Sequence, residues 1–296
     1  MKTTKALLSE ALAVAAMAVC AGCGATGNAD QSRFGEMTLE NGHPSFQILR
    51  MPGGVRFGLS EARPARPAPL LLVFSSTLEQ ALGQVPYNDT GKALAGRGWL
   101  SASLDLPCHG QQRKPGEPKG LRGWHCRLDR GEDPLKGFVA RVAGVLDSLI
   151  AGGWVDPKRI AVCGTSRGAS SAMHLAARER RIQCVAAFSP VTELRAVQEL
   201  DGMARPEAAA QLALIHTADA LAGRPVFASI GDQDRRVSTD HAIAFARSLS
   251  AASARRNGAS RIELHVAPLP KGVEGHHTPY GAHEKAAERD VSQSQC

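Results

Sequence analysis

Short, mostly apolar runs alternate with helical stretches along this chain, and this alternation constrains the fold more than any other feature. The apolar runs are residues 70–74, 99–104, 160–163, 184–188, 225–230 and 262–266. Such a run is typical of a strand that is covered on both faces, and strands separated by helices predict a parallel sheet. The sequence therefore predicts an α/β fold with a doubly wound, mostly parallel sheet flanked by helices.

Turn and cap residues place further elements. Residues 46–59 alternate around a Pro-Gly-Gly turn at 52–54, which predicts an N-terminal antiparallel hairpin. An Asp-Pro pair at 133–134 predicts the start of an amphipathic helix, and the glycine pair at 152–153 predicts its end. Between residues 188 and 225 the chain has room for helices and a modest lid, but not for a large cap domain.

The first residues have the pattern of an export signal. A short basic start precedes a small-apolar run at 11–22, which is too short to remain in a bilayer as a helix. The segment Cys20-Ala-Gly-Cys23 resembles a bacterial lipobox, and this resemblance implies that Cys23 is lipidated and tethers the protein to a membrane. An ordinary cleaved signal, or an Ala-rich first helix of a cytoplasmic protein, is the alternative.

We therefore expect three parts in the chain. Residues 1–22 are predicted to be a signal peptide, 23–43 a flexible N-terminal segment, and 44–296 the folded domain. The protein is then exported, and is either periplasmic or anchored to the membrane as a lipoprotein.

Charge and cysteine content exclude several classes of partner. The net charge is +7, but the basic residues are scattered and aromatic residues make up 4% of the chain, so no nucleic-acid partner is expected. Outside the leader no Cys-x-x-Cys pair occurs, and we expect no metal site. Cys108 and Cys126 lie in loop sequence and could pair in an oxidising compartment, whereas Cys163 and Cys184 are predicted to be inert core residues.

The motif Gly164-Thr-Ser166-Arg-Gly168 joins a predicted strand to a predicted helix. This is the context that a nucleophile elbow requires, because a strained turn with small flanking residues holds the serine hydroxyl clear of the helix. Ser166 is therefore a candidate nucleophile. A plain Gly/Ser turn between a strand and a helix is the alternative interpretation.

An elbow serine needs a histidine to accept its proton and a carboxylate to orient that histidine, in the chain order Ser, Asp, His. Asp232 and Asp234 follow the predicted strand at 225–230, and His276 and His277 follow the last predicted strand. Polar groups after the carboxyl ends of parallel strands meet at one edge of the sheet. The sequence thus predicts a catalytic triad and leaves the choice within each pair open.

Several segments from about residue 69 to the C-terminus resemble the α/β-hydrolases, closest to the dienelactone-hydrolase and prolyl-oligopeptidase-like esterase branch. Residues 105–110 resemble the Asp-x-Pro-Gly-His-Gly segment of that family, residues 155–160 its lead into the elbow strand, and residues 231–237 its acid loop.

The resemblance implies a role for individual residues. It implies Ser166 as nucleophile, Asp234 as orienting acid and His276 as base, with Asp232 and His277 as the alternatives. The oxyanion hole would consist of backbone N–H groups, one from Arg167 and the other, because the family's His-Gly is replaced here, from Ser76. Asp105 and His109 are expected to stabilise a turn. The Arg167 side chain is expected either to bind an acidic substrate group or to be solvated or packed on the sheet.

These residues predict a serine hydrolase that cleaves a small-molecule or polymer-borne carboxylic ester and needs no cofactor. Ester cleavage is favoured over peptide cleavage because an amide demands stronger protonation of the leaving group, and because the chain shows no large extra domain of the kind that the peptidase branch carries. A peptidase, a thioesterase or a catalytically silent exported binding protein of the same fold is the alternative.

Overall fold

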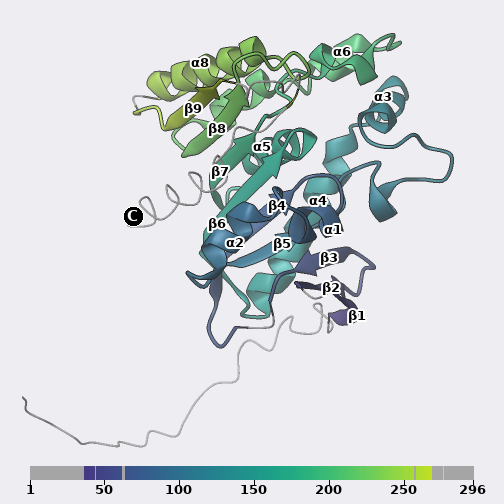
Figure 1. The fold of residues 1–296 in the computed structure, drawn as a ribbon, viewed down its shortest axis with the longest axis vertical. Helices are drawn as coiled ribbons and strands as arrows, with labels where there is room; N and C mark the ends of the chain where they lie inside the picture. The colour runs from purple at the N-terminus through teal and green to yellow at the C-terminus, as the bar shows by residue number, and fades with distance from the viewer. Residues whose placement is uncertain (1–36, 44, 62–63, 257, 269–275, 277–296) are drawn as a thin grey trace, which may run out of the picture. The chain divides into compact units, whose positions relative to one another are not determined.

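A sheet of nine strands organises the residues that the structure describes, which are 37–43, 45–61, 64–256, 258–268 and 276 of a computed structural model. The order across the sheet is β1-β2-β3-β5-β4-β6-β7-β8-β9 (Figure 1). The bounds are β1 Thr38–His43, β2 Phe46–Arg50, β3 Arg56–Leu59, β4 Ala68–Phe74, β5 Leu100–Ser103, β6 Val155–Thr165, β7 Ile182–Phe188, β8 Val226–Gly231 and β9 Ile262–Ala267. All strands from β5 to β9 in this order are parallel, which confirms the predicted α/β fold.

The antiparallel edge is one strand larger than predicted. The hairpin of β2 and β3 is confirmed, and β3 joins β5 in antiparallel register. In addition, β1 pairs with β2, with a bulge between Leu39 and Asn41. Strand β1 lies within residues 23–43, for which the sequence predicts a flexible segment. Its residues are mostly polar, and they form a strand through their pairing with β2.

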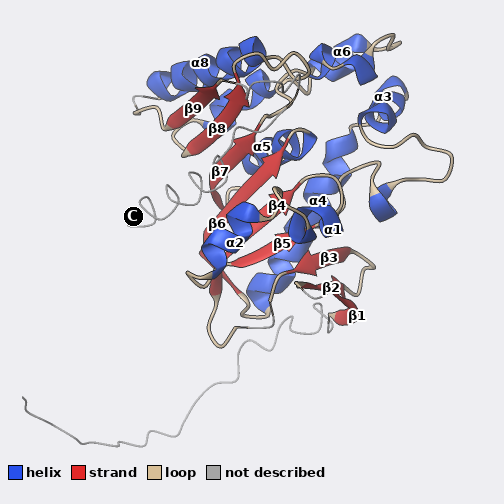
Figure 2. Ribbon diagram, viewed as in Figure 1, coloured by secondary structure: helices blue, strands red, loops and turns tan. Residues whose placement is uncertain are grey.

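Helices cover both faces of the sheet (Figure 2). Their bounds are α1 Leu78–Gly83, α2 Asp89–Ala95, α3 Leu121–Asp129, α4 Pro134–Ala151, α5 Arg167–Arg178, α6 Pro206–Ala210, α7 Ala218–Leu221 and α8 Thr239–Arg255, with 3-10 turns η2 Gly110–Gln112, η3 Leu194–Ala196, η4 Gln198–Leu200 and η5 Leu214–Thr217. The predicted helix at 134–151 is α4, and the Asp133 side chain caps it by accepting from Leu135 N at 2.8 Å. The segment between β7 and β8 holds short helical elements, as expected.

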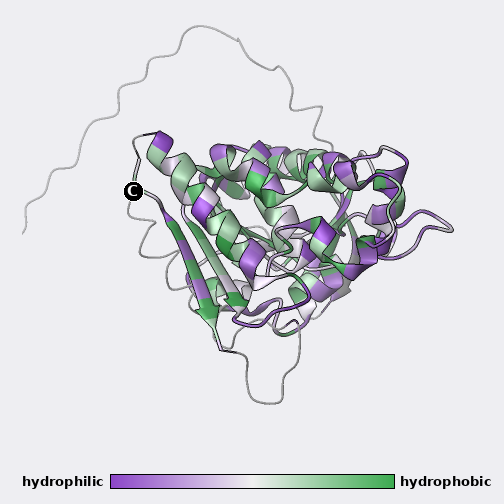
Figure 3. Ribbon diagram, turned by 90° about the horizontal axis from the view of Figure 1, so that it is seen from above, coloured by the Kyte–Doolittle hydropathy of each residue, from purple (hydrophilic) through white to green (hydrophobic). Residues whose placement is uncertain are grey.

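The buried strand β4 explains why helices pack on both faces of the sheet. Leu70, Leu72 and Phe74 enter one apolar cluster with side chains of α4, α5 and α8, whereas Leu71 and Val73 enter a second cluster with α1 and α2. Successive side chains of a strand point to opposite faces, so a run without polar residues needs cover on both sides. The helices that supply this cover combine hydrophilic and hydrophobic residues (Figure 3). Among the described helices, none is long and apolar enough to cross a membrane.

The proposed pairing of Cys108 with Cys126 is wrong, because both are free thiols. The Cys108 side chain is buried against Gly123 of α3 and its thiol interacts with the Glu117 carboxylate instead. Burial raises the pKa of Cys108 to about 12, so this thiol stays protonated. Cys163 is a buried core residue as expected, and Cys184 is half-buried on β7.

Candidate active site

Ser166 stands at the junction of β6 and α5 in a strained conformation, with φ 57° and ψ −120°. A residue with a side chain rarely adopts this conformation, which costs about 1–3 kcal/mol and persists only where the surroundings impose it. Here they do: Ser166 N donates to Phe188 O at 2.8 Å, and Ser166 O accepts from Ser170 N at 3.1 Å. Ser166 therefore lies in a strained turn between a strand and a helix, and its role as nucleophile stays a prediction.

The flanking glycines of the elbow have no room for a side chain. A Cβ atom on Gly164 would lie 2.5 Å from the carbonyl carbon of Gly168. One on Gly168 would lie 2.2 Å from Phe74 O and 2.9 Å from Ser75 N. The end of β4 therefore touches the elbow directly, which brings the turn that contains Ser76 next to Ser166.

Asp234 is held in the loop after β8 by its own backbone neighbours. Its Oδ1 accepts from Arg236 N and from Val237 N, each at 3.0 Å, and the residue is 2% exposed. Its Oδ2 accepts from Nδ1 of His276 at 2.8 Å. Because the carboxylate only accepts, Nδ1 carries the proton and the neutral imidazole keeps a lone pair on Nε2.

The structure thus brings Asp234 and His276 together, from loops after β8 and β9. Asp232 is exposed, and its backbone N–H donates to Ala267 O. His277, the alternative base, lies outside the described residues.

The loop after β5 supports the elbow from another side. Asp105 accepts from Leu78 N at 3.0 Å and from Gln111 N at 2.8 Å, so it stabilises two turns, as expected. Burial raises the pKa of this carboxyl group, and the two N–H donors oppose that effect. His109 has a role that the sequence analysis missed, since its Nε2 lies 3.1 Å from Nη1 of Arg167.

Arg236 and Glu199 are two further charged residues near the elbow. Arg236 donates to Glu199 Oε1, which joins the loop after β8 to η4. Burial and the nearby charge of Arg236 lower the pKa of Arg167, and the charge of Glu199 opposes this effect. No sequence motif identifies Glu199, whereas His109 could have been found from its place in the Asp-x-Pro-Cys-His-Gly segment.

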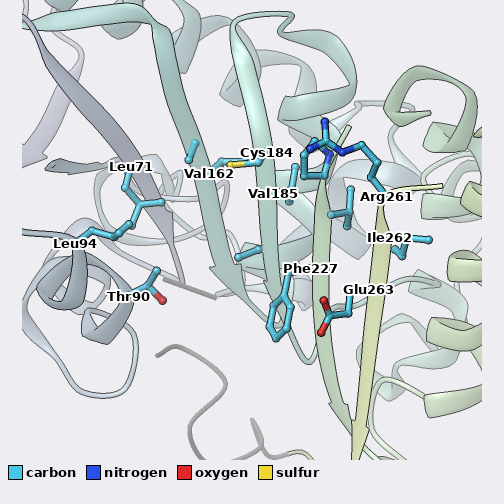
Figure 4. A pocket seen from close by; sticks show the side chains of 14 residues that line it. Leu71, Thr90, Leu94, Val162, Cys184, Val185, Phe227, Arg261, Ile262 and Glu263 are labelled. Carbon is cyan, nitrogen blue, oxygen red and sulfur yellow. The ribbon is translucent and has the colours of Figure 1, made fainter. Parts of the chain in front are cut away.

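A cavity of about 280 Å³ opens on the sheet away from these side chains (Figure 4). It is lined mainly by apolar residues of β4, β6, β7, β8 and β9, with Thr90 and Leu94 of α2 beside them. None of Ser166, Asp234 and His276 lines it, so it is separate from the candidate active site. Within the described part of the chain, no group of three or more His, Cys, Asp or Glu side chains is arranged to hold a metal ion.

Solved structures with the α/β-hydrolase fold are similar to this chain. An acetyl xylan esterase from Paenibacillus sp. R4 is 18% identical with a TM-score of 0.58, and 87% of each chain is covered. A glucuronoyl esterase from Teredinibacter turnerae is 15% identical with a TM-score of 0.56, covering 88% of this chain and 77% of that one. Dipeptidyl peptidase 4 from Porphyromonas gingivalis is 16% identical with a TM-score of 0.60, covering 83% of this chain and 35% of that one.

At these identities the structural matches establish the fold, which includes both esterases and peptidases. A search of curated proteins finds no match to the chain. The model of the prolyl oligopeptidase family, in contrast, matches residues 125–292, a range that includes the elbow, Asp234 and His276. Because this match spans more than half of the sequence, the chain belongs to the prolyl oligopeptidase family.

Proposed function

We propose that this protein is a serine hydrolase that cleaves carboxylic esters through an acyl-enzyme on Ser166. The observation that carries the proposal is the 2.8 Å contact between Asp234 Oδ2 and His276 Nδ1, with the other carboxylate oxygen held by two backbone N–H groups. This contact fixes the imidazole tautomer that a general base needs. The strained elbow at Ser166 supports the choice of nucleophile.

In the proposed reaction, Ser166 Oγ attacks the ester carbonyl carbon and its proton passes to Nε2 of His276. The imidazolium, stabilised by Asp234, then protonates the alkoxide as the C–O bond breaks, and the alcohol leaves. A water molecule repeats the sequence on the acyl-serine and releases the carboxylic acid. No step needs a cofactor.

The developing oxyanion requires two N–H donors. Arg167 N is the first N–H of α5, where the helix leaves its amide groups without internal partners and its dipole favours negative charge. Ser76 follows β4 in the turn that lies against Gly168, and we propose its N–H as the second donor.

Ester cleavage is proposed ahead of peptide cleavage. Esterases are matched over most of their length, 87% for the acetyl xylan esterase, whereas the dipeptidyl peptidase is matched over 35%. An ester also needs less protonation of its leaving group than an amide does. Peptide hydrolysis is the second candidate, because the family match and the dipeptidyl peptidase both favour it.

Ser166→Ala tests the proposal. We expect a fluorophosphonate probe to label the wild-type protein and not this variant, and hydrolysis of 4-nitrophenyl acetate to fall about a thousandfold or more. Ser170→Ala, which removes a neighbouring buried hydroxyl from α5, should still be labelled. A wild-type protein that neither reacts with the probe nor hydrolyses esters and peptide 4-nitroanilides would instead be a catalytically silent binding protein.

Export is proposed from residues 1–22, whose structure lies outside the described residues. The mass of the mature N-terminus distinguishes the alternatives, because a lipidated Cys23, a cleaved chain without lipid and an uncleaved chain differ in mass.

A further inference from the structure

Arg167 follows the candidate nucleophile in the sequence, and its guanidinium has no anionic partner among the residues that the structure describes. Within the described residues, no carboxylate lies in salt-bridge range of Arg167, and the one hydrogen bond of its side chain joins Nη1 to His109 Nε2 at 3.1 Å. The side chain is nevertheless partly buried, and a Cβ atom on Gly120 would lie 2.9 Å from Nη1. A partly buried cation without a counterion is costly to keep, so its presence needs an explanation.

His109 fixes the position of this guanidinium without neutralising it. Its Nδ1 faces Pro107 O at 2.9 Å, so Nδ1–H donates to the carbonyl and Nε2 accepts from Arg167. Burial lowers the pKa of His109 to about 4, which keeps the ring neutral. The full positive charge therefore stays on Arg167, and the nitrogens not bound to His109 have no hydrogen-bond partner in the described part of the chain.

The charges around Arg167 leave an excess of positive charge. Glu199 is the nearby acid, and it already accepts from Arg236. Lys119 adds a further cation close to His109, where its charge lowers the pKa of that ring. The carboxylates of Glu199 and Asp234 are already hydrogen-bonded, to Arg236 and His276. Neither is therefore paired with Arg167, and its remaining charge favours an anionic ligand.

We propose that the Arg167 side chain binds a carboxylate carried by the ester substrate, and that His109 is the positioning residue that holds the guanidinium for it. This inference rests on the proposed function, since Arg167 directly follows Ser166, the residue to which the substrate would bind. A guanidinium presents parallel N–H donors that match the two oxygens of a carboxylate. The substrate class is accordingly an ester whose acyl or alcohol part is acidic.

Two pairs of matched substrates test this selectivity. Mono(4-nitrophenyl) glutarate and 4-nitrophenyl 5-methylhexanoate have the same shape and differ by a carboxylate on the acyl side. The pair of 4-acetoxybenzoate and methyl 4-acetoxybenzoate differs by a carboxylate on the alcohol side. We expect wild-type kcat/KM to favour the acidic member of at least one pair by about tenfold or more, mainly through KM.

The variants separate charge recognition from a general loss of activity. Arg167→Gln keeps the backbone N–H and should lower the acidic-to-neutral ratio about tenfold or more, whatever happens to the absolute rates. His109→Leu should also lower the ratio, while His109→Gln, which keeps an acceptor for Arg167, should retain most of it. Arg180→Gln, which removes an exposed positive charge beyond α5, should leave the ratio unchanged.

Failure of the inference differs from failure of the proposed function. If wild-type protein hydrolyses neutral esters through Ser166 but prefers neither acid, or if the preference survives Arg167→Gln, the inference is wrong and the proposed function stands. If no ester is hydrolysed, the proposed function fails. Calorimetry with monomethyl glutarate then decides, because binding that requires Arg167 supports the inference and absence of binding overturns it.

Discussion

The two oxygens of Asp234 have separate tasks. Oδ1 accepts two backbone N–H groups from its own loop, and Oδ2 accepts from His276. The backbone donors fix the rotation of the carboxylate, and this rotation in turn aims Oδ2 at the imidazole. Asp232 lies two residues earlier on the exposed side of the same loop.

Asp234→Asn should be far more damaging than Asp232→Asn. The backbone donors retain the amide oxygen at the Oδ1 position, so the amide NH2 faces Nδ1 of His276. That nitrogen must then accept, and the ring proton moves to Nε2, where a lone pair is needed. We expect kcat for 4-nitrophenyl acetate to fall about a thousandfold or more, while Asp232→Asn changes it less than tenfold. A large loss in Asp232→Asn alone would assign the acid to Asp232.

Some contacts of individual site residues can be predicted from the sequence, and others cannot. Asp234 follows Gly231 by three residues, and the resemblance to the α/β-hydrolases implies the acid at this spacing. The prediction is possible because a loop of constant length places the same position at its end. The contact between Arg167 and His109 joins residues 58 apart, and local spacing contains no information about it.

The junction of β6 and α5 depends on backbone contact more than on side-chain packing. Gly168 allows α5 to start against the carbonyl of Phe74 at the end of β4. Helix α5, strand β6 and strand β4 therefore meet in close backbone contact at the point where Ser166 adopts its strained conformation.

Gly168→Ala should disrupt this junction. The added Cβ would lie 2.2 Å from Phe74 O, and all of its nearest atoms are backbone, so β4 would have to shift. We expect the free energy of unfolding in urea to fall by roughly 3 kcal/mol or more. Gly144→Ala is the control, because a Cβ there meets nothing within 4 Å inside α4, and it should stabilise by about 0.5–1 kcal/mol. Equal stability of the two variants would contradict the tight junction.

Elements with a strong internal pattern were predicted, and those stabilised by neighbours were not. The continuous apolar run of β4 and the cap and spacing of α4 contain the physical reasons for their structures. Strand β1 carries no such pattern, because it forms by pairing with β2. The short helices η3, η4, α6, η5 and α7 are likewise fixed by packing against longer elements.

Two buried histidines link the stability of the whole molecule to pH. Nε2 of His174 donates to Leu212 O at 3.0 Å, and burial lowers the pKa of both His174 and His109 to about 4. In the unfolded chain the pKa returns to 6.5, so the unfolded state takes up protons first on acidification. Stability is therefore lost as the pH falls from 6.5 towards 4, by an amount on the order of 3 kcal/mol per histidine.

His174→Gln should remove part of this acid sensitivity. Glutamine can still donate to Leu212 O but does not titrate, so it eliminates one of the two proton-linked losses. Between pH 7 and pH 4.5 the wild-type free energy of unfolding should drop about 2 kcal/mol further than that of the variant. Urea unfolding at both pH values measures the difference. His216→Gln, at an exposed histidine, should follow the wild type; an identical drop in His174→Gln would show that His174 is not held neutral.

Strand β9 lies at the edge of the sheet, and this position affects how the candidate active site responds to heat or denaturant. Among the described strands, β9 pairs with β8 alone, whereas β6, which leads to Ser166, is paired on both sides. If β9 detaches, His276 loses its alignment with Asp234 while the interior strands remain paired. Partial opening at this border costs less than unfolding the core. We therefore expect two transitions under heat or denaturant, with loss of the contact between Asp234 and His276 before loss of the sheet.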